Sequence, residues 1–110
     1  MRITEKDTKF FINLSNDKNK IHFDKKYAKK FFFKEPIAHG INIINFALAE
    51  FIKTKNYKLI IQNLSINLKN FLVIGEDFEL KIYKKKIIVK NQLNIKIEID
   101  VKYLKTSKKV

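Results

Sequence analysis

The apolar residues in the first part of the chain recur at helical spacing. Thr4, followed three positions later by Asp7, resembles the start of a helix. Asp24 is placed to cap a second short helix over residues 25–30. The helix that begins after Thr4 is expected to be short and amphipathic and to end near Ser15. Its apolar residues are Phe10, Phe11 and Leu14.

Residues 16–23 have no periodicity and are expected to form a loop. Residues 31–33 are three phenylalanines, which we interpret as aromatic core beneath a connecting segment. Residues 41–52 are apolar or small on all sides, which predicts a long helix enclosed by other structure. Pro36 disfavours helix just before this segment, and Gly40 permits a tight turn at its start.

Beyond residue 56, apolar and polar residues alternate as in β-strands. The alternation is clearest over residues 95–103, and a turn is expected at Gly75. Residues 64, 66 and 68 are expected to face one side of a strand, and residues 65, 67 and 69 the other. Such alternation predicts an antiparallel sheet with one solvated face, and helices followed by strands indicate the α+β class.

The composition limits the classes of function. The chain has 110 residues, 45% of them hydrophobic, which suits one globular domain. Its net charge is +13, and such a charge attracts nucleic acid, anionic membranes or acidic proteins. Only Arg2 is arginine, and the exposed faces of the predicted strands carry few aromatic residues besides Tyr83 and Tyr103. A nucleic-acid partner is therefore not expected, and a solvated lysine surface is the preferred interpretation.

The chain has no cysteine, which excludes disulfides and thiolate chemistry. The first residues lack the apolar segment of a signal peptide, and no apolar run reaches membrane-spanning length. We therefore expect a cytoplasmic protein without a membrane partner.

The candidate chemistry lies in residues 11–40. Asp17 and His22 are five positions apart in the predicted loop, and Gly40 opens the predicted long helix. An acid and an imidazole on one loop can share proton transfers near neutral pH. Free backbone N–H groups at a helix N-terminus can stabilise a developing negative charge. Together these groups suit the addition of water to an activated carbonyl compound, or its removal.

The sequence F-x-x-L-S-x-D-x-N-x-I-H-x-D-x-x-Y-A at residues 11–28, followed by P-I-A-H-G at residues 36–40, resembles MaoC-like dehydratases and (R)-specific enoyl-CoA hydratases. Asp17, Asn19 and His22 match the family signature G-D-x-N-P-x-H. Asn16 replaces its glycine and Lys20 its proline. The loss of proline removes a constraint on the loop, whereas Asn16 can still adopt a left-handed conformation.

The resemblance implies a single hotdog domain over residues 1–110, in which an antiparallel sheet wraps a long central helix, and a homodimer. It implies a hydro-lyase that interconverts trans-2-enoyl and 3-hydroxyacyl thioesters of coenzyme A or acyl carrier protein, without cofactor or metal. Asp17 and His22 would be the catalytic acid and base. The Gly40 N–H would polarise the thioester carbonyl, and Asn19 would orient the loop or the water. We interpret His39 as ordering the turn before the helix.

Three alternatives remain open at the level of the sequence. A thioesterase of this fold would need a carboxylate on the central helix, where only Glu50 is present. A hotdog protein could retain thioester binding without catalysis. A basic nucleic-acid-binding module is the remaining alternative, and steep salt dependence of oligonucleotide binding would favour it.

Overall fold

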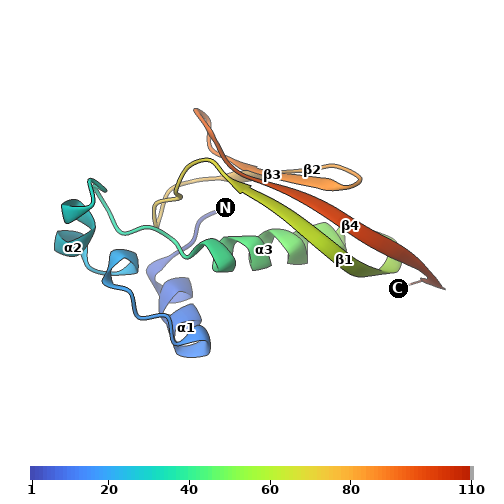
Figure 1. The fold of residues 1–110 in the computed structure, drawn as a ribbon, viewed down its shortest axis with the longest axis horizontal. Coiled ribbons are helices and arrows are strands. Elements are labelled where there is room, and N and C mark those ends of the chain that lie inside the picture. Colours follow the sequence, from blue (N-terminus) through green and yellow to red (C-terminus); the bar gives the residue numbers. More distant parts are fainter. Residues whose placement is uncertain (110) are drawn as a thin grey trace. The chain divides into compact units, whose positions relative to one another are not determined.

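The structure is a computed structural model that describes residues 1–109 and the side chains of residues 1–106. The described residues form two compact units. The first holds residues 1–43 and 71–78, and the second holds residues 44–70 and the chain from residue 79 onward. The element order, helices followed by antiparallel strands, is the α+β order predicted from the sequence (Figure 1).

The first unit begins with α1 (Glu5–Ser15), for which the predicted capping is confirmed. The Thr4 side chain accepts from the Asp7 N–H, and the Asp7 carboxylate accepts from the Thr4 N–H at 2.9 Å. The predicted apolar face is only partly correct. Thr8 and Phe11 are buried, whereas Phe10 and Leu14 are more than two-thirds exposed.

Two short elements follow, the 3-10 helix η1 (Lys20–His22) and α2 (Lys25–Lys30). The predicted loop therefore includes one helical turn. Asp24 caps α2 as predicted, and Ala28 is its buried residue. The expectation that residues 31–33 form core is wrong for Phe31, which is 50% exposed, and for Phe32, which is 97% exposed. Phe33 is half-buried, and its ring meets that of Phe71 edge-on.

Residues 71–78 return to the first unit and fix the extended segment before α3 (Gly40–Lys53). Ile37 forms a β-bridge with Val73, and the Ala38 N–H donates to the Leu72 carbonyl at 2.8 Å. The predicted turn is present at Gly75, whose φ of 88° is readily accessible to glycine. These bonds hold the backbone of residues 37–38 immediately before His39.

The second unit contains one four-stranded antiparallel sheet in the order β1-β4-β3-β2. Its strands are β1 (Tyr57–Leu68), β2 (Glu79–Ile82), β3 (Lys86–Lys90) and β4 (Ile95–Lys109). The inward residues of the two central strands are fully buried, as the alternation predicts; they are Ile87, Val89, Ile97 and Ile99. Lys96, expected on the solvated face, is instead 9% exposed.

The part of α3 within the second unit packs on the sheet through Ala47 and Phe51, both fully buried. The Phe51 ring meets that of Tyr103 edge-on, with centroids 5.9 Å apart. The helix is not enclosed on all sides by its own chain, since Ile52 remains 46% exposed. No helix in the described residues combines the length and apolar character needed to cross a bilayer.

Candidate active site

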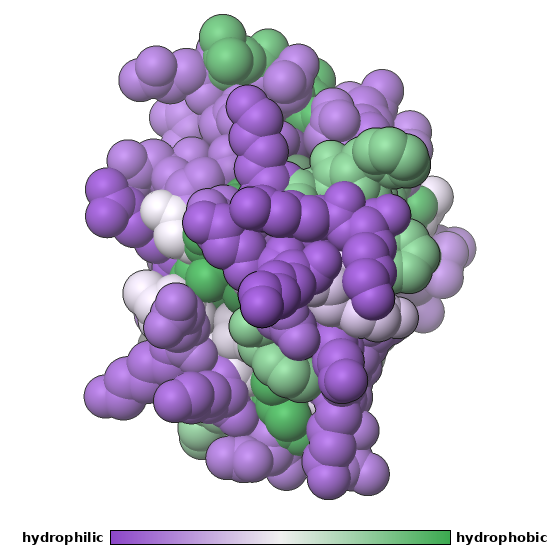
Figure 2. Space-filling view, turned by 90° about the vertical axis from the view of Figure 1, so that its left-hand side faces the viewer, coloured by the Kyte–Doolittle hydropathy of each residue, from purple (hydrophilic) through white to green (hydrophobic). Residues whose placement is uncertain are grey.

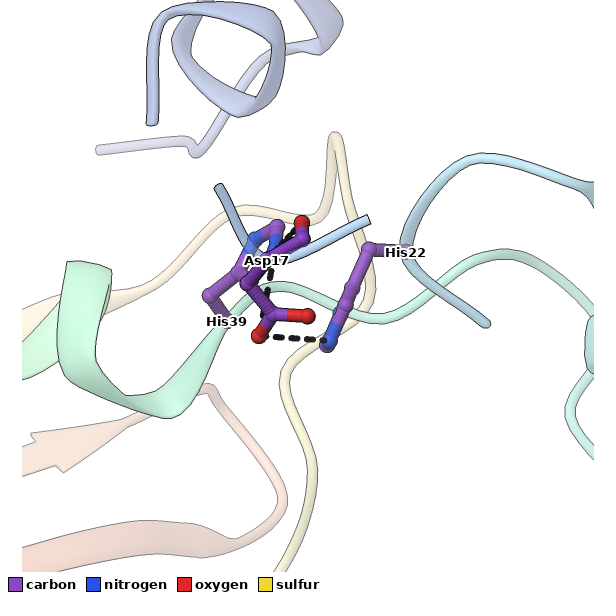
Figure 3. A group of neighbouring side chains, drawn as sticks. All are labelled: Asp17, His22 and His39. Carbon is purple, nitrogen blue, oxygen red and sulfur yellow. Dashed lines mark hydrogen bonds and ion pairs between the residues drawn. The ribbon is translucent and has the colours of Figure 1, made fainter. Parts of the chain in front are cut away.

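Asp17 is placed by the way α1 ends. The helix closes at Asn16, which adopts the left-handed conformation with φ of 60° and donates its N–H to the Ile12 carbonyl at 2.8 Å. The Asp17 N–H then donates to the Ser15 hydroxyl at 3.2 Å. This left-handed residue redirects the chain and brings Asp17 into the group of side chains in Figure 3.

Asn19 stabilises the loop itself. Its side-chain oxygen accepts from the Ile21 N–H at 3.1 Å and thereby caps η1. Its own N–H donates to Asp17 Oδ1 at 3.2 Å. The sequence leaves two roles open for Asn19, to orient the loop or to orient the water. The contacts observed in the structure are with the loop.

His22 has a defined tautomer. Its Nδ1 lies 2.8 Å from the Ile37 carbonyl oxygen, which can only accept, so Nδ1 carries the proton. In the neutral imidazole the lone pair is therefore on Nε2, which lies 3.9 Å from Asp17 Oδ2. Two acceptor atoms thus face the same region, one from a carboxylate and one from an imidazole.

His39 lies beside both groups, and its side chain is almost completely buried. Its ring stacks on that of His22 with centroids 3.6 Å apart, and it meets the Phe11 ring at a tilt of 52° with centroids 4.7 Å apart. Its Nε2 lies 3.3 Å from the Asp17 carbonyl oxygen and 3.7 Å from Asp17 Oδ2 (Figure 3). His39 is therefore part of the cluster, whereas the sequence interpretation assigned it only to the turn. The one sign in the sequence is an imidazole among apolar residues directly before Gly40.

The environment of His39 favours its neutral form. Burial lowers the pKa of His39 below its usual value, and the nearby His22 imidazole lowers it further, while Asp17 opposes both effects. Its Nε2 proton is directed to the Asp17 carbonyl, which leaves Nδ1 buried without a hydrogen-bond partner. A positive charge on His39 would be poorly stabilised there.

Among the residues with described side chains, Asp17, His22 and His39 form a group that could hold a metal ion by residue type, with candidate ligand atoms within 4.8 Å of one another. Their arrangement suits a metal poorly. A metal lies near the plane of each ligating imidazole at about 2.1 Å. Two rings that stack 3.6 Å apart at an interplanar angle of 23° cannot both direct lone pairs at one such ion.

Gly40 begins α3, directly after His39. The first N–H groups of a helix have no partner within the helix, and its dipole favours negative charge there. A methyl group added at Gly40 would meet no atom within 4 Å. The space beside the helix N-terminus is therefore open.

A cavity of about 540 Å³ lies beside His22, whereas Asp17 and Gly40 do not line it. His22 and Phe23 line it together with apolar residues such as Ile12 and Ile74. Its wall is mixed in charge, because Lys9 and Lys18 line it together with Glu5 and Glu35. The cavity can therefore accommodate a ligand that has an apolar part and polar groups.

The comparisons with known proteins concern the family and the fold of the chain. Residues 1–102 match the family model of the MaoC-like domain. The chain belongs to the MaoC-like family. It therefore falls within a family of hydratases and dehydratases, and its solved neighbours have the hotdog fold predicted from the sequence. No curated protein matches the sequence.

Three solved structures illustrate the similarity in fold. R-hydratase PhaJ1 from Pseudomonas aeruginosa, unliganded, has a TM-score of 0.81 at 23% identity, over 100% of this chain and 79% of that one. The (R)-hydratase from A. caviae involved in PHA biosynthesis has a TM-score of 0.68 at 20% identity, over 92% and 86%. A protein described as a monoamine oxidase regulatory protein, from Archaeoglobus, has a TM-score of 0.74 at 21% identity, over 97% and 85%.

Proposed function

We propose that this MaoC-like protein is a hydro-lyase that interconverts trans-2-enoyl and 3-hydroxyacyl thioesters. The observation that carries the proposal is the pair of acceptors, Asp17 Oδ2 and His22 Nε2, at 3.9 Å. A water molecule that donates one hydrogen to each would be held with its lone pair free to attack. The Ile37 carbonyl supports this role because it keeps the His22 proton on Nδ1.

In the hydration direction, the water oxygen bonds to the β-carbon of the enoyl group while one water proton passes to the Asp17–His22 pair. The carbon–carbon double bond becomes an enolate, whose oxygen accepts a hydrogen bond from the Gly40 N–H. The pair then delivers a proton to the α-carbon, so that one water molecule is added in all. We assign the acid and base roles to Asp17 and His22 jointly, because coupled groups share their protons.

The test is the absorbance of the conjugated enoyl thioester of crotonyl-CoA, followed with purified protein. We expect the signal to fall with wild type, and kcat to fall at least a hundredfold in Asp17→Asn and in His22→Ala, since each removes one acceptor. Asp100→Asn is the matched control, because Asp100 is an exposed aspartate on β4 that pairs with Lys86. Full activity in both site variants would overturn the assignment of Asp17 and His22.

We also propose that the protein acts as a homodimer. Ile66 of β1 lies opposite Ile99, and Leu68 lies opposite Ile97, so all four share the core face of the sheet. Ile99 and Ile97 are buried, yet Ile66 is 44% and Leu68 is 49% exposed. The core face at this edge strand is therefore left partly uncovered by the chain itself, and a second copy would cover it.

A second candidate function is thioester binding without catalysis, in the same fold. The observation that favours it is the structural similarity to a protein described as regulatory rather than as an enzyme. A crotonyl-CoA signal that stays constant under every condition, combined with saturable binding of the thioester, would support this alternative. Thioester hydrolysis is less well supported, because Glu50 on α3 pairs with Lys53 at 3.2 Å.

A further inference from the structure

The turn after α2 contains the most exposed aromatic side chain of the described residues, Phe32, at 97%. The Phe33 N–H donates to the Ala28 carbonyl and the Phe32 N–H to the Lys29 carbonyl, each at 3.1 Å. This pair of bonds is the Schellman arrangement that closes many helices, and it places Phe32 at the position that glycine usually occupies. Phe32 accordingly has a φ of 68°.

A phenylalanine is an unfavourable choice at this position. A bulky side chain in the left-handed region is strained, and an exposed phenyl ring contributes no buried area in return. Phe31, directly before it, is also 50% exposed. Folding alone therefore does not explain Phe32, and strained residues of this kind occur often at functional surfaces.

The surroundings of Phe32 are positively charged. A shallow hollow of about 410 Å³ is lined by Phe32 and Phe33 together with Lys25, Lys29 and Lys34. We call Phe31 and the residues that line this hollow the basic-aromatic turn. Lys25 pairs with Glu35 at 3.0 Å, whereas Lys29 and Lys34 have no carboxylate partner among the residues with described side chains. Figure 2 looks onto the side on which α2 lies in Figure 1, where hydrophilic side chains dominate and hydrophobic ones appear in separate areas.

The basic-aromatic turn adjoins the cavity of the candidate active site. Glu35 lines both the shallow hollow and the 540 Å³ cavity that contains His22. A molecule bound to the turn would therefore lie at the cavity wall. The cavity wall itself is mixed in charge, with Lys9 and Lys18 beside Glu5 and Glu35. The lysines and exposed aromatic rings of the turn suit a larger partner that remains outside the cavity.

We infer that the basic-aromatic turn docks an acidic protein that carries the acyl group as a thioester and presents it to His22. This inference rests on the proposed function. It decides between the two groups that could carry the acyl chain, coenzyme A and acyl carrier protein. Exposed lysines of a strongly basic chain would face carboxylates of the carrier, and Phe32 would enter an apolar site between them. Such contacts raise the association rate and fall with ionic strength.

The experiment compares crotonyl-CoA with the crotonyl thioester of a purified acidic acyl carrier protein, using wild type, Phe32→Gly and Lys29→Glu. Phe32→Gly relieves the left-handed strain, so its Tm should rise. Its KM for the carrier thioester should nevertheless increase at least tenfold, with less than a twofold change for crotonyl-CoA and unchanged kcat for both. Lys29→Glu should show the same KM split without the rise in Tm. Leu93→Gly is the matched control, because Leu93 is 87% exposed and lies outside the turn.

Equal KM changes for both thioesters would overturn the inference, because the turn would then bind coenzyme A as well as the carrier protein. Loss of binding to phosphatidylserine vesicles in Phe32→Gly, with carrier kinetics unaffected, would overturn it in favour of a membrane surface. Wild type inactive on both thioesters would reject the proposed function instead. In that case the docking surface is tested by titration calorimetry with the carrier protein. Binding by wild type that is lost in Phe32→Gly would still support the surface, and equal binding by the two proteins would overturn it.

Discussion

At the scale of single residues, the charge that the site can hold is limited by the stacked rings of His22 and His39. Their centroids are 3.6 Å apart, and one carboxylate, Asp17, faces both. Two imidazolium ions at this separation would repel each other, and burial further disfavours the charged form of His39. A neutral His39 can donate to the Asp17 carbonyl while His22 keeps a lone pair toward the carboxylate.

The lowered pKa of His39 predicts how stability depends on pH. In the unfolded chain His39 has its usual pKa of about 6.5, so below this pH the unfolded state binds more protons than the folded state. The contribution to stability is therefore complete above pH 6.5 and decreases as the pH falls toward the folded pKa. We expect the Tm of wild type to fall between pH 7.5 and pH 5, and this slope to be smaller in His39→Gln.

The measurement is thermal unfolding across that range, followed by circular dichroism. His39→Phe, which keeps an aromatic ring on His22 and Phe11 but cannot titrate, is the companion variant. Slopes in both variants as steep as in wild type would show that other groups cause the pH dependence.

At the scale of elements, the position of the proposed acid depends on how α1 terminates. Asn16 closes the helix in the left-handed region, and the next residue is Asp17. Asparagine tolerates this region better than most residues because its short polar side chain can bond locally. The family signature has glycine here, so the replacement keeps the required backbone conformation.

This conformation gives the second prediction. Asn16→Gly should fold at least as well as wild type, whereas Asn16→Val should lower the free energy of unfolding by about 1–2 kcal/mol, because a β-branched residue is strained at a φ of 60°. Urea denaturation measures the difference. Lys18→Val, in the same loop and without positive φ, controls for the added valine and should change stability by less than about 0.5 kcal/mol. An equal loss in both variants would contradict the role of the left-handed residue.

At the scale of the whole molecule, no strand of the described residues pairs with the outer edge of β1, the second longest strand. Long apolar edge strands tend to associate unless they are covered. Ile66 and Leu68 lie on the core face of this edge and are nearly half exposed. α3 leaves Ile52 exposed as well. These surfaces agree with the proposed homodimer.

We therefore expect light scattering coupled to size-exclusion chromatography to give the mass of a dimer for wild type. Ile66→Lys should shift the mass to that of a monomer, since a charge on an apolar contact face opposes association. Ser65→Lys is the control, because Ser65 is exposed on the opposite face of the same strand. A monomeric wild type, or equal masses for the two variants, would remove the support for this interface.

The local elements could be predicted from the sequence because their causes are local. The capping box of Thr4 and Asp7, the Asp24 cap and the alternation along β4 each depend on residues within a few positions of one another. The family could be predicted because its signature spans consecutive residues. Asp17 and His22 came together as expected, since both lie in one short loop.

Long-range contacts decided the rest. No local pattern joins His39 to Asp17, 22 positions away, because their approach depends on the bonds between residues 36–38 and residues 72–74. Exposure was equally non-local: three consecutive phenylalanines look like core, but the end of α2 leaves Phe32 pointing into solvent. The sequence by itself determined the elements and the family, through local backbone preferences and periodicity. Only the tertiary structure decided which side chains meet and which remain exposed, because burial depends on what the distant parts of the chain cover.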